Sequence, residues 1–332
     1  MLQCECAAAH LCDVCAVVDT HLQHSNFYFF LYSLPKFTIK HFIYMQTQKT
    51  SNKSSKVYFI GSGPGNADLI TVKGATVLSQ AEVIITDRLA GDEIIKQYAN
   101  PNAIIIDVGK QGGNAKSYQQ KDINALLVQF AHLYEKVVRL KGGDIAFFSN
   151  IYDELKTLSD NNIAYEIIPG ITAASGASAY TGIPLTARGY SRGVQLLTYY
   201  KNTIISNESW KHLAAFEETL VFYMSSNNLL SIVENLLQAG AEKDIPFIVV
   251  EQATTPNQKV QSFTLQSFLK NTAQSFTSPS IVIMGSVASL HKQFSWFNEA
   301  TASSNYFRNI EEETSYLKIK SSIIQKNTAH VN

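Results

Sequence analysis

Short apolar runs alternate with amphipathic stretches from residue 57 onward, and this alternation predicts the fold of the first half of the chain. The predicted strands cover residues 57–60, 83–86, 104–108, 136–140 and 165–168. The predicted helices cover residues 69–80, a short segment before residue 104, 120–134 and 151–160. Strands that are separated by helices in this way predict a mostly parallel sheet covered on both faces.

A second half begins after Pro169 and Gly170, which we interpret as a hinge or linker. The alternation is predicted to continue there, with strands at 193–199, 219–223, 246–250 and 280–284 and a helix at 228–239 that ends at Gly240. The fold class is therefore α/β, with two α/β domains at 56–168 and 169–297. We expect the polar tail, 298–332, to be a frayed helix or disordered.

Residues 1–55 do not share this pattern. The apolar segment 27–34 is interrupted by Pro35 and Lys36 well before the length of a membrane span, and it lacks the features of a signal peptide. Met45 precedes a polar lead-in to the first strand. We therefore expect residues 1–55 to be a disordered or spurious extension, with Met45 as the natural start.

Composition narrows the possible partners. A chain of 332 residues is long enough for two domains, and its 45% apolar content allows a full core. The formal net charge is zero at pH 7, so no global basic field favours binding to nucleic acid. We expect neither a nucleic acid nor a membrane as a partner.

The cysteines are confined to the start of the chain, at positions 4, 6, 12 and 15. Their spacing is compatible with a metal clip, but no later cysteine or histidine completes a folded site around it. We therefore expect no metal. A cysteine-free body indicates a reducing compartment, which makes the cytoplasm the expected location.

A glycine-rich turn follows the first predicted strand, with glycine at 61, 63 and 65 and proline at 64. Such a loop exposes backbone that a ligand can approach, although a turn without any ligand is the alternative. Asn66 stands where a dinucleotide-binding fingerprint needs glycine, and Pro64 lacks the N–H that a phosphate cradle uses. A cofactor without phosphates therefore fits this loop better.

Nine segments, in order and with their spacing kept, give the chain a family resemblance. They are GSGPGNADLITVKG at 61–74, ITDRL at 85–89, VGKQ at 108–111, QQKDIN at 119–124, VVRLKGGD at 137–144, IIPGITAASGASAYTGIPLTAR at 167–188, TLVFYM at 219–224, VVEQATTPNQ at 249–258 and SPSIVIMGSV at 278–287. Together they resemble the tetrapyrrole methylase family, most closely its uroporphyrinogen-III C-methyltransferase members.

The resemblance implies two α/β domains with S-adenosylmethionine, later S-adenosylhomocysteine, in the cleft between them, usually in a homodimer. By position, the family's cofactor contacts carry over to nine residues. They are Pro64, Gly142, Gly143, Asp144, Phe147, Thr172, Ala173, Met224 and Ala253.

The resemblance also implies the catalytic and substrate-binding residues. The family's proton acceptor falls on Asp87 and its proton donor on Lys110, while Arg88 and Arg188 are positioned to pair with carboxylates of the tetrapyrrole. From the residues alone, Asp87 could instead be a helix N-cap, and Lys110 could hold a substrate carboxylate. Methyl transfer to an electron-rich pyrrole carbon requires no metal.

Several family positions are altered in this chain. Residues 145–151 read IAFFSNI, so Asn150 replaces an arginine, and Gln111 and Ala187 replace two other cationic family residues. We expect C-methylation of uroporphyrinogen III to precorrin-2, through precorrin-1, on the way to sirohaem or cobalamin. Three alternatives stay open: methylation of a later precorrin, methylation of an RNA nucleotide, and a non-catalytic module that binds the cofactor.

Overall fold

The structure is a computed structural model, and it describes residues 55–109, 118–200, 205–215, 217–270, 274–298 and 305–307. All of these residues belong to one compact unit, Lys53–Asn332. The expectations for residues 1–54, including the four cysteines and Met45, lie outside the described residues. So do Lys110, Gln111 and most of the tail.

The first half forms a five-stranded sheet in the order β3-β2-β4-β1-β5, and every pairing in it is parallel. The parallel sheet predicted from the sequence is thus confirmed. Its strands are β1 (Lys56–Gly61), β2 (Val83–Thr86), β3 (Ile104–Asp107), β4 (Lys136–Lys141) and β5 (Ala164–Ile168). The helices around it are η1 (Ala67–Leu69), α4 (Val72–Leu78), η2 (Arg88–Ala90), α5 (Asp92–Tyr98), α6 (Gln120–Leu133) and α7 (Ile151–Asp160).

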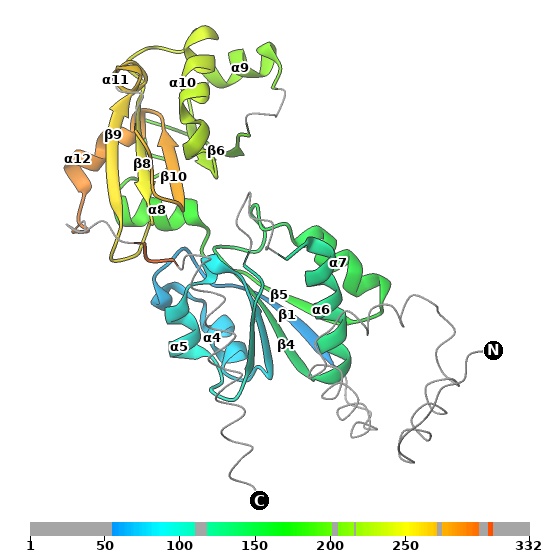
Figure 1. The fold of residues 1–332 in the computed structure, drawn as a ribbon. Helices are drawn as coiled ribbons and strands as arrows, with labels where there is room; N and C mark the ends of the chain where they lie inside the picture. Colours follow the sequence, from blue (N-terminus) through cyan, green and yellow to red (C-terminus); the bar gives the residue numbers. More distant parts are fainter. Residues whose placement is uncertain are drawn as a thin grey trace, which may run out of the picture. The chain divides into compact units, whose positions relative to one another are not determined.

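Both faces of this sheet are covered, as predicted, because neighbouring residues of one strand enter different cores. Phe59 belongs to the cluster shared with α6 and α7, whereas Ile60 belongs to the cluster shared with α4 and α5. Figure 1 shows α6 and α7 on one side of β1 and β4, with α4 and α5 on the other.

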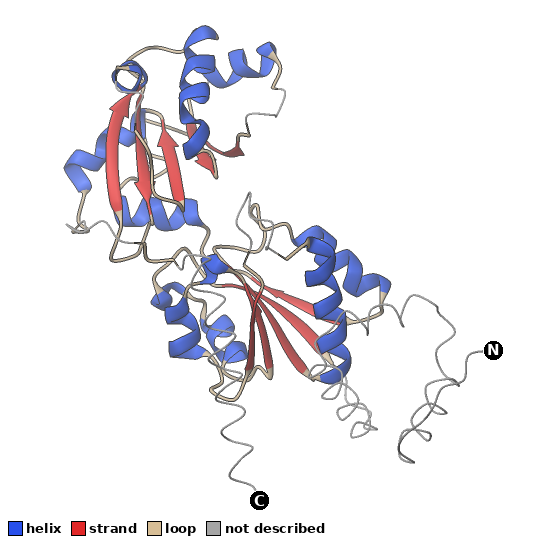
Figure 2. Ribbon diagram, in the orientation of Figure 1, coloured by secondary structure: helices blue, strands red, loops and turns tan. Residues whose placement is uncertain are grey.

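The second half forms another five-stranded sheet, in the order β6-β7-β10-β8-β9. Figure 2 shows the strands of both sheets in red. The strands of the second sheet are β6 (Val194–Thr198), β7 (Thr219–Tyr223), β8 (Pro246–Glu251), β9 (Lys259–Thr264) and β10 (Ser280–Met284). Only the β6–β7 pair is parallel; the β7–β10, β10–β8 and β8–β9 pairs are antiparallel. The predicted continuation of strand–helix alternation is therefore wrong between β8 and β9, which a helix-free loop connects.

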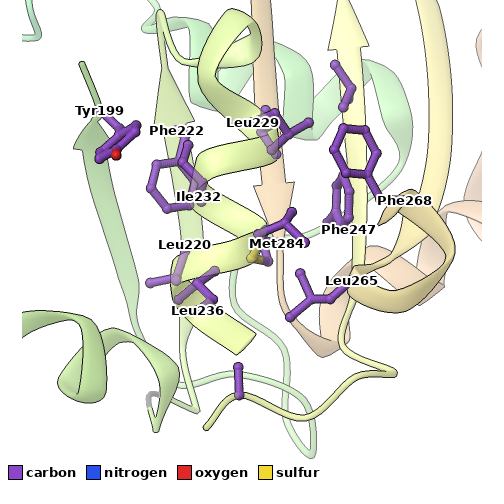
Figure 3. Close-up of a cluster of buried hydrophobic side chains, with 14 of the residues drawn as sticks. Tyr199, Leu220, Phe222, Leu229, Ile232, Leu236, Phe247, Leu265, Phe268 and Met284 are labelled. Atoms are coloured by element: carbon purple, nitrogen blue, oxygen red, sulfur yellow. The ribbon is translucent and has the colours of Figure 1, made fainter. Parts of the chain in front are cut away.

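The helices of the second half are α8 (Ala173–Thr181), α9 (Asn207–Ala214), η3 (Ser226–Asn228), α10 (Leu229–Gln238), α11 (Leu265–Leu269), η4 (Ser286–Leu290) and α12 (His291–Phe294). One core lies between the sheet and α9–α11 (Figure 3), where Phe222, Phe247 and Phe268 meet Ile232. The opposite face packs on α8 through Ala174 and Ala177. Packing on both faces of this sheet fixes the positions of its strand ends, which surround the candidate functional site.

Candidate functional site

The ends of β1 and β4 are joined beyond the sheet by a pair of glycines. Gly63 N–H donates to the Gly143 carbonyl over 3.1 Å, and Gly143 N–H donates back to the Gly63 carbonyl over 2.8 Å. A Cβ added to Gly61 would lie 2.7 Å from both Gly143 O and Gly170 N. Glycine is required here because three strand-end loops meet at backbone distance.

At most glycines of these loops, other protein atoms fill the space that a side chain would occupy, so that space is not open to a ligand. A Cβ at Gly65 would lie 2.6 Å from Cγ2 of Thr255, and one at Gly142 would lie 2.6 Å from Cβ of Leu89. Gly143 differs, because its added Cβ would meet only Ala173 N, at 3.9 Å. Its φ of 70° lies in the left-handed region that favours glycine. Among these glycines, Gly143 is the one whose backbone faces open space.

A cavity of about 760 Å³, part of it open to solvent, lies at these loop ends. Its lining combines residues of both sheets, and most of them are apolar. All nine residues predicted to contact the cofactor line it: Pro64, Gly142, Gly143, Asp144, Phe147, Thr172, Ala173, Met224 and Ala253. The cavity walls that were not predicted are Gly63, Leu89, Phe148, Tyr223, Val250, Pro279, Ser280, Ile281 and Phe307.

A polar corner of this cavity lies where α8 begins. The Tyr223 hydroxyl is 2.6 Å from Oγ1 of Thr172 and accepts a 3.0 Å hydrogen bond from Ala174 N–H. The Tyr223 hydroxyl thereby caps the N-terminus of α8, where the N-cap residue Thr172 makes no side-chain capping hydrogen bond. Burial raises the pKa of Tyr223 above its ordinary value, so the hydroxyl stays protonated. The corner supplies fixed hydroxyl groups beside an apolar cavity.

Met224 follows β7 with a strained backbone. Its φ is 52°, in the region that non-glycine residues rarely adopt, and its side chain is 52% exposed. The Tyr200 hydroxyl lies 3.5 Å from the Met224 sulfur. Phe148 also has a φ of 52°, and its ring lies 4.8 Å from that of Tyr223. Strain of this kind often occurs at ligand sites, where the surrounding structure holds the residue in place.

A second pocket, of about 540 Å³ including open space, adjoins the first through Leu89, which lines both. It lies among β2, β4 and the start of α6. Its lining consists of Asp87, Arg88, Leu89, Val108, Gln120, Ile123, Arg139, Lys141, Ser149 and Asn150. Its lining thus carries three cationic side chains, Arg88, Arg139 and Lys141, and one carboxylate, Asp87.

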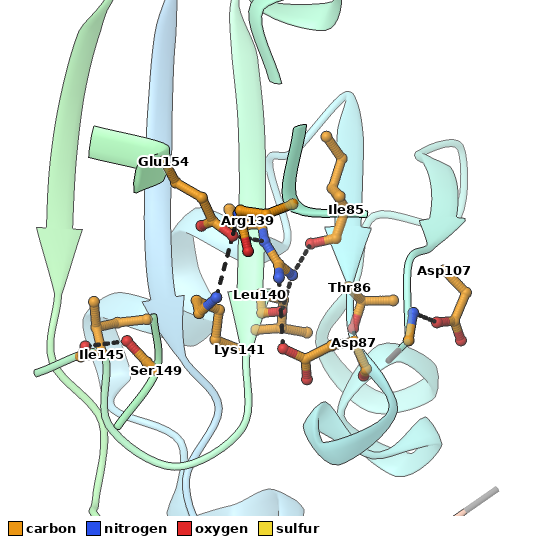
Figure 4. Close-up of polar contacts among 12 residues, drawn as sticks. Ile85, Thr86, Asp87, Asp107, Arg139, Leu140, Lys141, Ile145, Ser149 and Glu154 are labelled. Atoms are coloured by element: carbon orange, nitrogen blue, oxygen red, sulfur yellow. Dashed lines mark hydrogen bonds and ion pairs between the residues drawn. The ribbon is translucent and has the colours of Figure 1, made fainter. Parts of the chain in front are cut away.

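A buried charge network forms one wall of the second pocket (Figure 4). Glu154 is fully buried and accepts hydrogen bonds from Nε of Arg139, over 3.3 Å, and from Nζ of Lys141, over 3.2 Å. Arg139 also donates to the backbone carbonyls of Ile85 and Leu140. Burial, and after it the neighbouring Arg139 charge, lower the pKa of Lys141 below its ordinary value.

Asp87 lies at the edge of this network. Its Oδ2 is 3.6 Å from Nη2 of Arg139, while its Oδ1 is buried without a hydrogen-bond partner. The residue occupies the N-cap position of η2, yet its side chain makes no capping hydrogen bond. The alternative interpretation as a helix cap therefore lacks the contact that would stabilise the helix.

The other predicted site residues do not all lie in the two pockets. Arg88 lines the second pocket beside Asp87, whereas Arg188 is exposed in the loop between α8 and β6 and lines neither pocket. Asn150 lines the second pocket with a left-handed φ of 59°. The position of Lys110 lies outside the described residues.

Our sequence reasoning missed Arg139 and Lys141 as site residues. Both lie in β4, two positions apart, and side chains with this spacing point to the same face of a strand. The available signal was two cations, Arg139 and Lys141, in the buried part of a strand whose other buried residues are apolar, because buried charges require partners.

The described residues offer neither a metal site nor a membrane span. Within the ranges that the structure describes, no three His, Cys, Asp or Glu side chains are grouped so that they could hold a metal ion. None of the helices in those ranges combines the length and the apolar character needed to span a bilayer.

Comparison with known proteins identifies relatives over most of the chain. A siroheme synthase from Ruthia magnifica is 38% identical over 258 residues, which are 77% of this chain and 54% of the relative. A siroheme synthase 2 from Yersinia enterocolitica is 42% identical over 245 residues, or 74% of this chain and 51% of that protein. The chain thus spans about half the length of these curated relatives.

A solved structure matches most of the chain. The uroporphyrin-III C-methyltransferase of Thermus thermophilus, crystallised with S-adenosylhomocysteine, is 28% identical with a TM-score of 0.61. The match covers 71% of this chain and 100% of that one. The family model for tetrapyrrole (corrin/porphyrin) methylases matches residues 56–269. The chain therefore belongs to the tetrapyrrole methylase family.

Proposed function

We propose that the chain is an S-adenosylmethionine-dependent C-methyltransferase that converts uroporphyrinogen III to precorrin-2 through precorrin-1. One observation carries the proposal. The cavity lined by all nine expected cofactor residues shares Leu89 with a cationic pocket that contains Asp87. A cofactor and a polyanionic substrate could thus meet at one side chain.

The first cavity fits S-adenosylmethionine in its chemistry. Its lining is mostly apolar with a few polar groups, as is usual for small-molecule sites, and the open backbone at Gly143 allows close approach. Met224 offers a polarizable surface to adenine. The carboxylate of Asp144 and the hydroxyl of Thr172 are available for the polar groups of the cofactor.

The second pocket fits a tetrapyrrole that carries several carboxylates. Arg88, Arg139 and Lys141 line it, and Glu154 compensates part of their charge from behind. Arg139 and Lys141 are held by hydrogen bonds before any substrate arrives, so little side-chain entropy remains to be lost on binding. Arg188 lies outside both pockets, and we leave it out of the proposed substrate contacts.

Asp87 is the proposed proton acceptor. When bound, S-adenosylmethionine supplies an electrophilic methyl group on its sulfonium. Addition of a methyl group to a pyrrole carbon leaves a cationic ring that must lose a proton, and the unpartnered Oδ1 of Asp87 can accept it. The side chains around Leu89 would hold substrate and cofactor in line for transfer. Lys110 remains the proposed proton donor, on the family resemblance alone.

We further propose a cytoplasmic homodimer without nucleic-acid or membrane partners. The family resemblance supports the dimer, and the zero net charge supports the absence of nucleic acid. The cysteine-free body supports a reducing compartment.

The test is an anaerobic assay of the full chain with methyl-labelled S-adenosylmethionine and uroporphyrinogen III. We expect label in the tetrapyrrole and the absorption spectrum of a dimethylated product. Binding of S-adenosylhomocysteine without transfer of label would contradict the proposed substrate. The same assay with later precorrins would then test the alternative that Asn150 and its altered loop motivate.

A further inference from the structure

The tail of the chain returns to the cofactor cavity at residues 305–307. Phe307 lines that cavity and is only 3% exposed. The matched family model ends at residue 269, so this wall lies outside the family match. Phe307 also stands apart from the four hydrophobic cores, because none of them includes it. Phe307 is thus buried at the cavity wall and outside those four clusters.

Tyr306 anchors the segment to loops from both sheets. Its backbone N–H donates to Oε1 of Gln252 over 2.7 Å, and its hydroxyl donates to the carbonyl of Gly65 over 3.4 Å. Gln252 directly follows β8, whereas Gly65 belongs to the glycine-rich loop after β1. A third loop approaches from Gly91, where an added Cβ would lie 3.9 Å from the Tyr306 ring.

The acceptor at Gln252 is itself rigid. Gln252 is 4% exposed, and its N–H donates over 2.8 Å to the carbonyl of Pro279, which lines the cavity. Its φ of 46° is left-handed, a conformation that persists only where the surrounding structure fixes it. Residues 305–307 are thus attached to a rigid residue that is bonded to the cavity wall.

The ring of Tyr306 is partly enclosed as well. Burial, together with the nearby carboxylates of Glu93 and Asp92, raises the pKa of Tyr306 above its ordinary value. Its ring packs edge-on against Phe307, with 5.2 Å between the centroids. The two aromatic side chains form one unit, in which Tyr306 makes the hydrogen bonds and Phe307 faces the cavity.

We propose that the Tyr306–Phe307 pair is a binding element for S-adenosylmethionine and S-adenosylhomocysteine, in which Phe307 completes the apolar wall of the cavity. This inference rests on the proposed function, since it takes the cavity as the cofactor site. Phe307 strengthens cofactor binding by excluding water from one side of the cavity. Because coupling is reciprocal, a bound cofactor must stabilise the docked tail by the same factor.

The test compares two phenylalanine variants of the full chain by calorimetric titration with S-adenosylhomocysteine. Phe307→Ala should weaken binding about tenfold, which corresponds to about 1.4 kcal/mol. The control, Phe294→Ala, removes a 49% exposed ring of α12 that lines neither pocket, and its affinity should stay within about twofold of the parent. Phe307→Leu, which keeps an apolar wall, should recover most of the affinity.

A second measurement requires no variant. In the parent chain, saturating S-adenosylhomocysteine should slow hydrogen exchange at the amides of Tyr306 and Phe307. Unchanged exchange, or equal or tighter binding by Phe307→Ala, would overturn the inference. If the parent itself binds no S-adenosylhomocysteine, the proposed function fails instead, so the two failures are distinguishable.

Discussion

The guanidinium Nη2 of Arg139 lies 3.6 Å from Oδ2 of Asp87, while Oδ1 of the same carboxylate is buried without a hydrogen-bond partner. Arg139 is itself held by Glu154 and by two backbone carbonyls. The carboxylate is therefore oriented from one side and free to accept a hydrogen bond or a proton at the other oxygen. This asymmetry is what a positioned general base requires.

Replacing Asp87 by Asn should slow methyl transfer by about 100-fold or more, because the amide cannot accept the proton that the methylated ring loses. The affinity for S-adenosylhomocysteine should stay within about twofold of the parent, since Asp87 lines the second pocket and not the first. Single-turnover rates and calorimetric titration provide the two measurements. An unchanged rate would assign Asp87 a structural role.

Replacing Glu154 by Gln should destabilise the fold by about 3–5 kcal/mol, because the buried Arg139 and Lys141 lose the carboxylate that both contact and Arg139 keeps only its 3.6 Å pair with Asp87. Urea denaturation measures the change. Glu93→Gln is a matched control, since its pair with Lys96 is exposed on both sides and should change stability by less than about 1 kcal/mol. Similar values for the two variants would show that the network contributes no more than a surface pair.

Replacing Gly142 by Ala should weaken S-adenosylhomocysteine binding about tenfold. The added Cβ would lie 2.6 Å from Cβ of Leu89 and 2.8 Å from its carbonyl oxygen, so the wall shared by the two pockets must shift. Gly189→Ala is the control, because it adds strain at a φ of 80° but meets no atom within 4 Å. Calorimetric titration should show normal affinity for this control.

Stability should fall in acid partly through Glu166. Hydrogen bonds from Lys56 and then from Lys73 lower the pKa of Glu166 to about 2. A carboxylate whose pKa is lower in the folded than in the unfolded state stabilises the fold above its unfolded pKa, which is near 4.5. That contribution is lost as pH falls towards 2.

Glu166→Gln isolates this contribution. The stability difference between parent and variant should be largest above about pH 5 and should shrink towards pH 2. It should also decrease at high salt, because Lys73 is 64% exposed. Denaturation curves at pH 7, 4, 3 and 2 measure it, and a difference that does not depend on pH would contradict the assignment.

Much of the fold was predictable because apolar runs and strands coincide. The bounds predicted for β2, β7 and β10 match the structure to the residue, and so do those of α7. The predicted helix 69–80 is instead a short turn, η1, followed by α4 from Val72. The reason is local, since the side chains of Asn66 and Thr71 each accept a backbone hydrogen bond and so begin two separate elements.

The strand β9 was not predicted because its sequence, KVQSFT, is largely polar. It is the edge strand of its sheet and pairs only with β8. An edge strand tolerates polar residues on both faces, so hydrophobic periodicity gives little signal. Its pairing with β8 is also what makes that side of the second sheet antiparallel.

Half of the lining of the first cavity was predicted from the sequence, because the motifs lie in loops that follow strands. Nine predicted residues gather around one cavity because their loops follow neighbouring strand ends. Phe307 and the network around Glu154 were not accessible in this way. Their roles depend on contacts between segments far apart in the chain, such as Tyr306 with Gly65.

Leu89 lines both pockets, and the missing side chain of Gly142 gives it the space it occupies. On the proposed function, a single inhibitor would occupy both pockets by crossing one aliphatic side chain, with an adenosine-like part on one side of Leu89 and a polycarboxylate part on the other. The linker length that gives the tightest binding would then report the distance between the two pockets in the inhibitor complex.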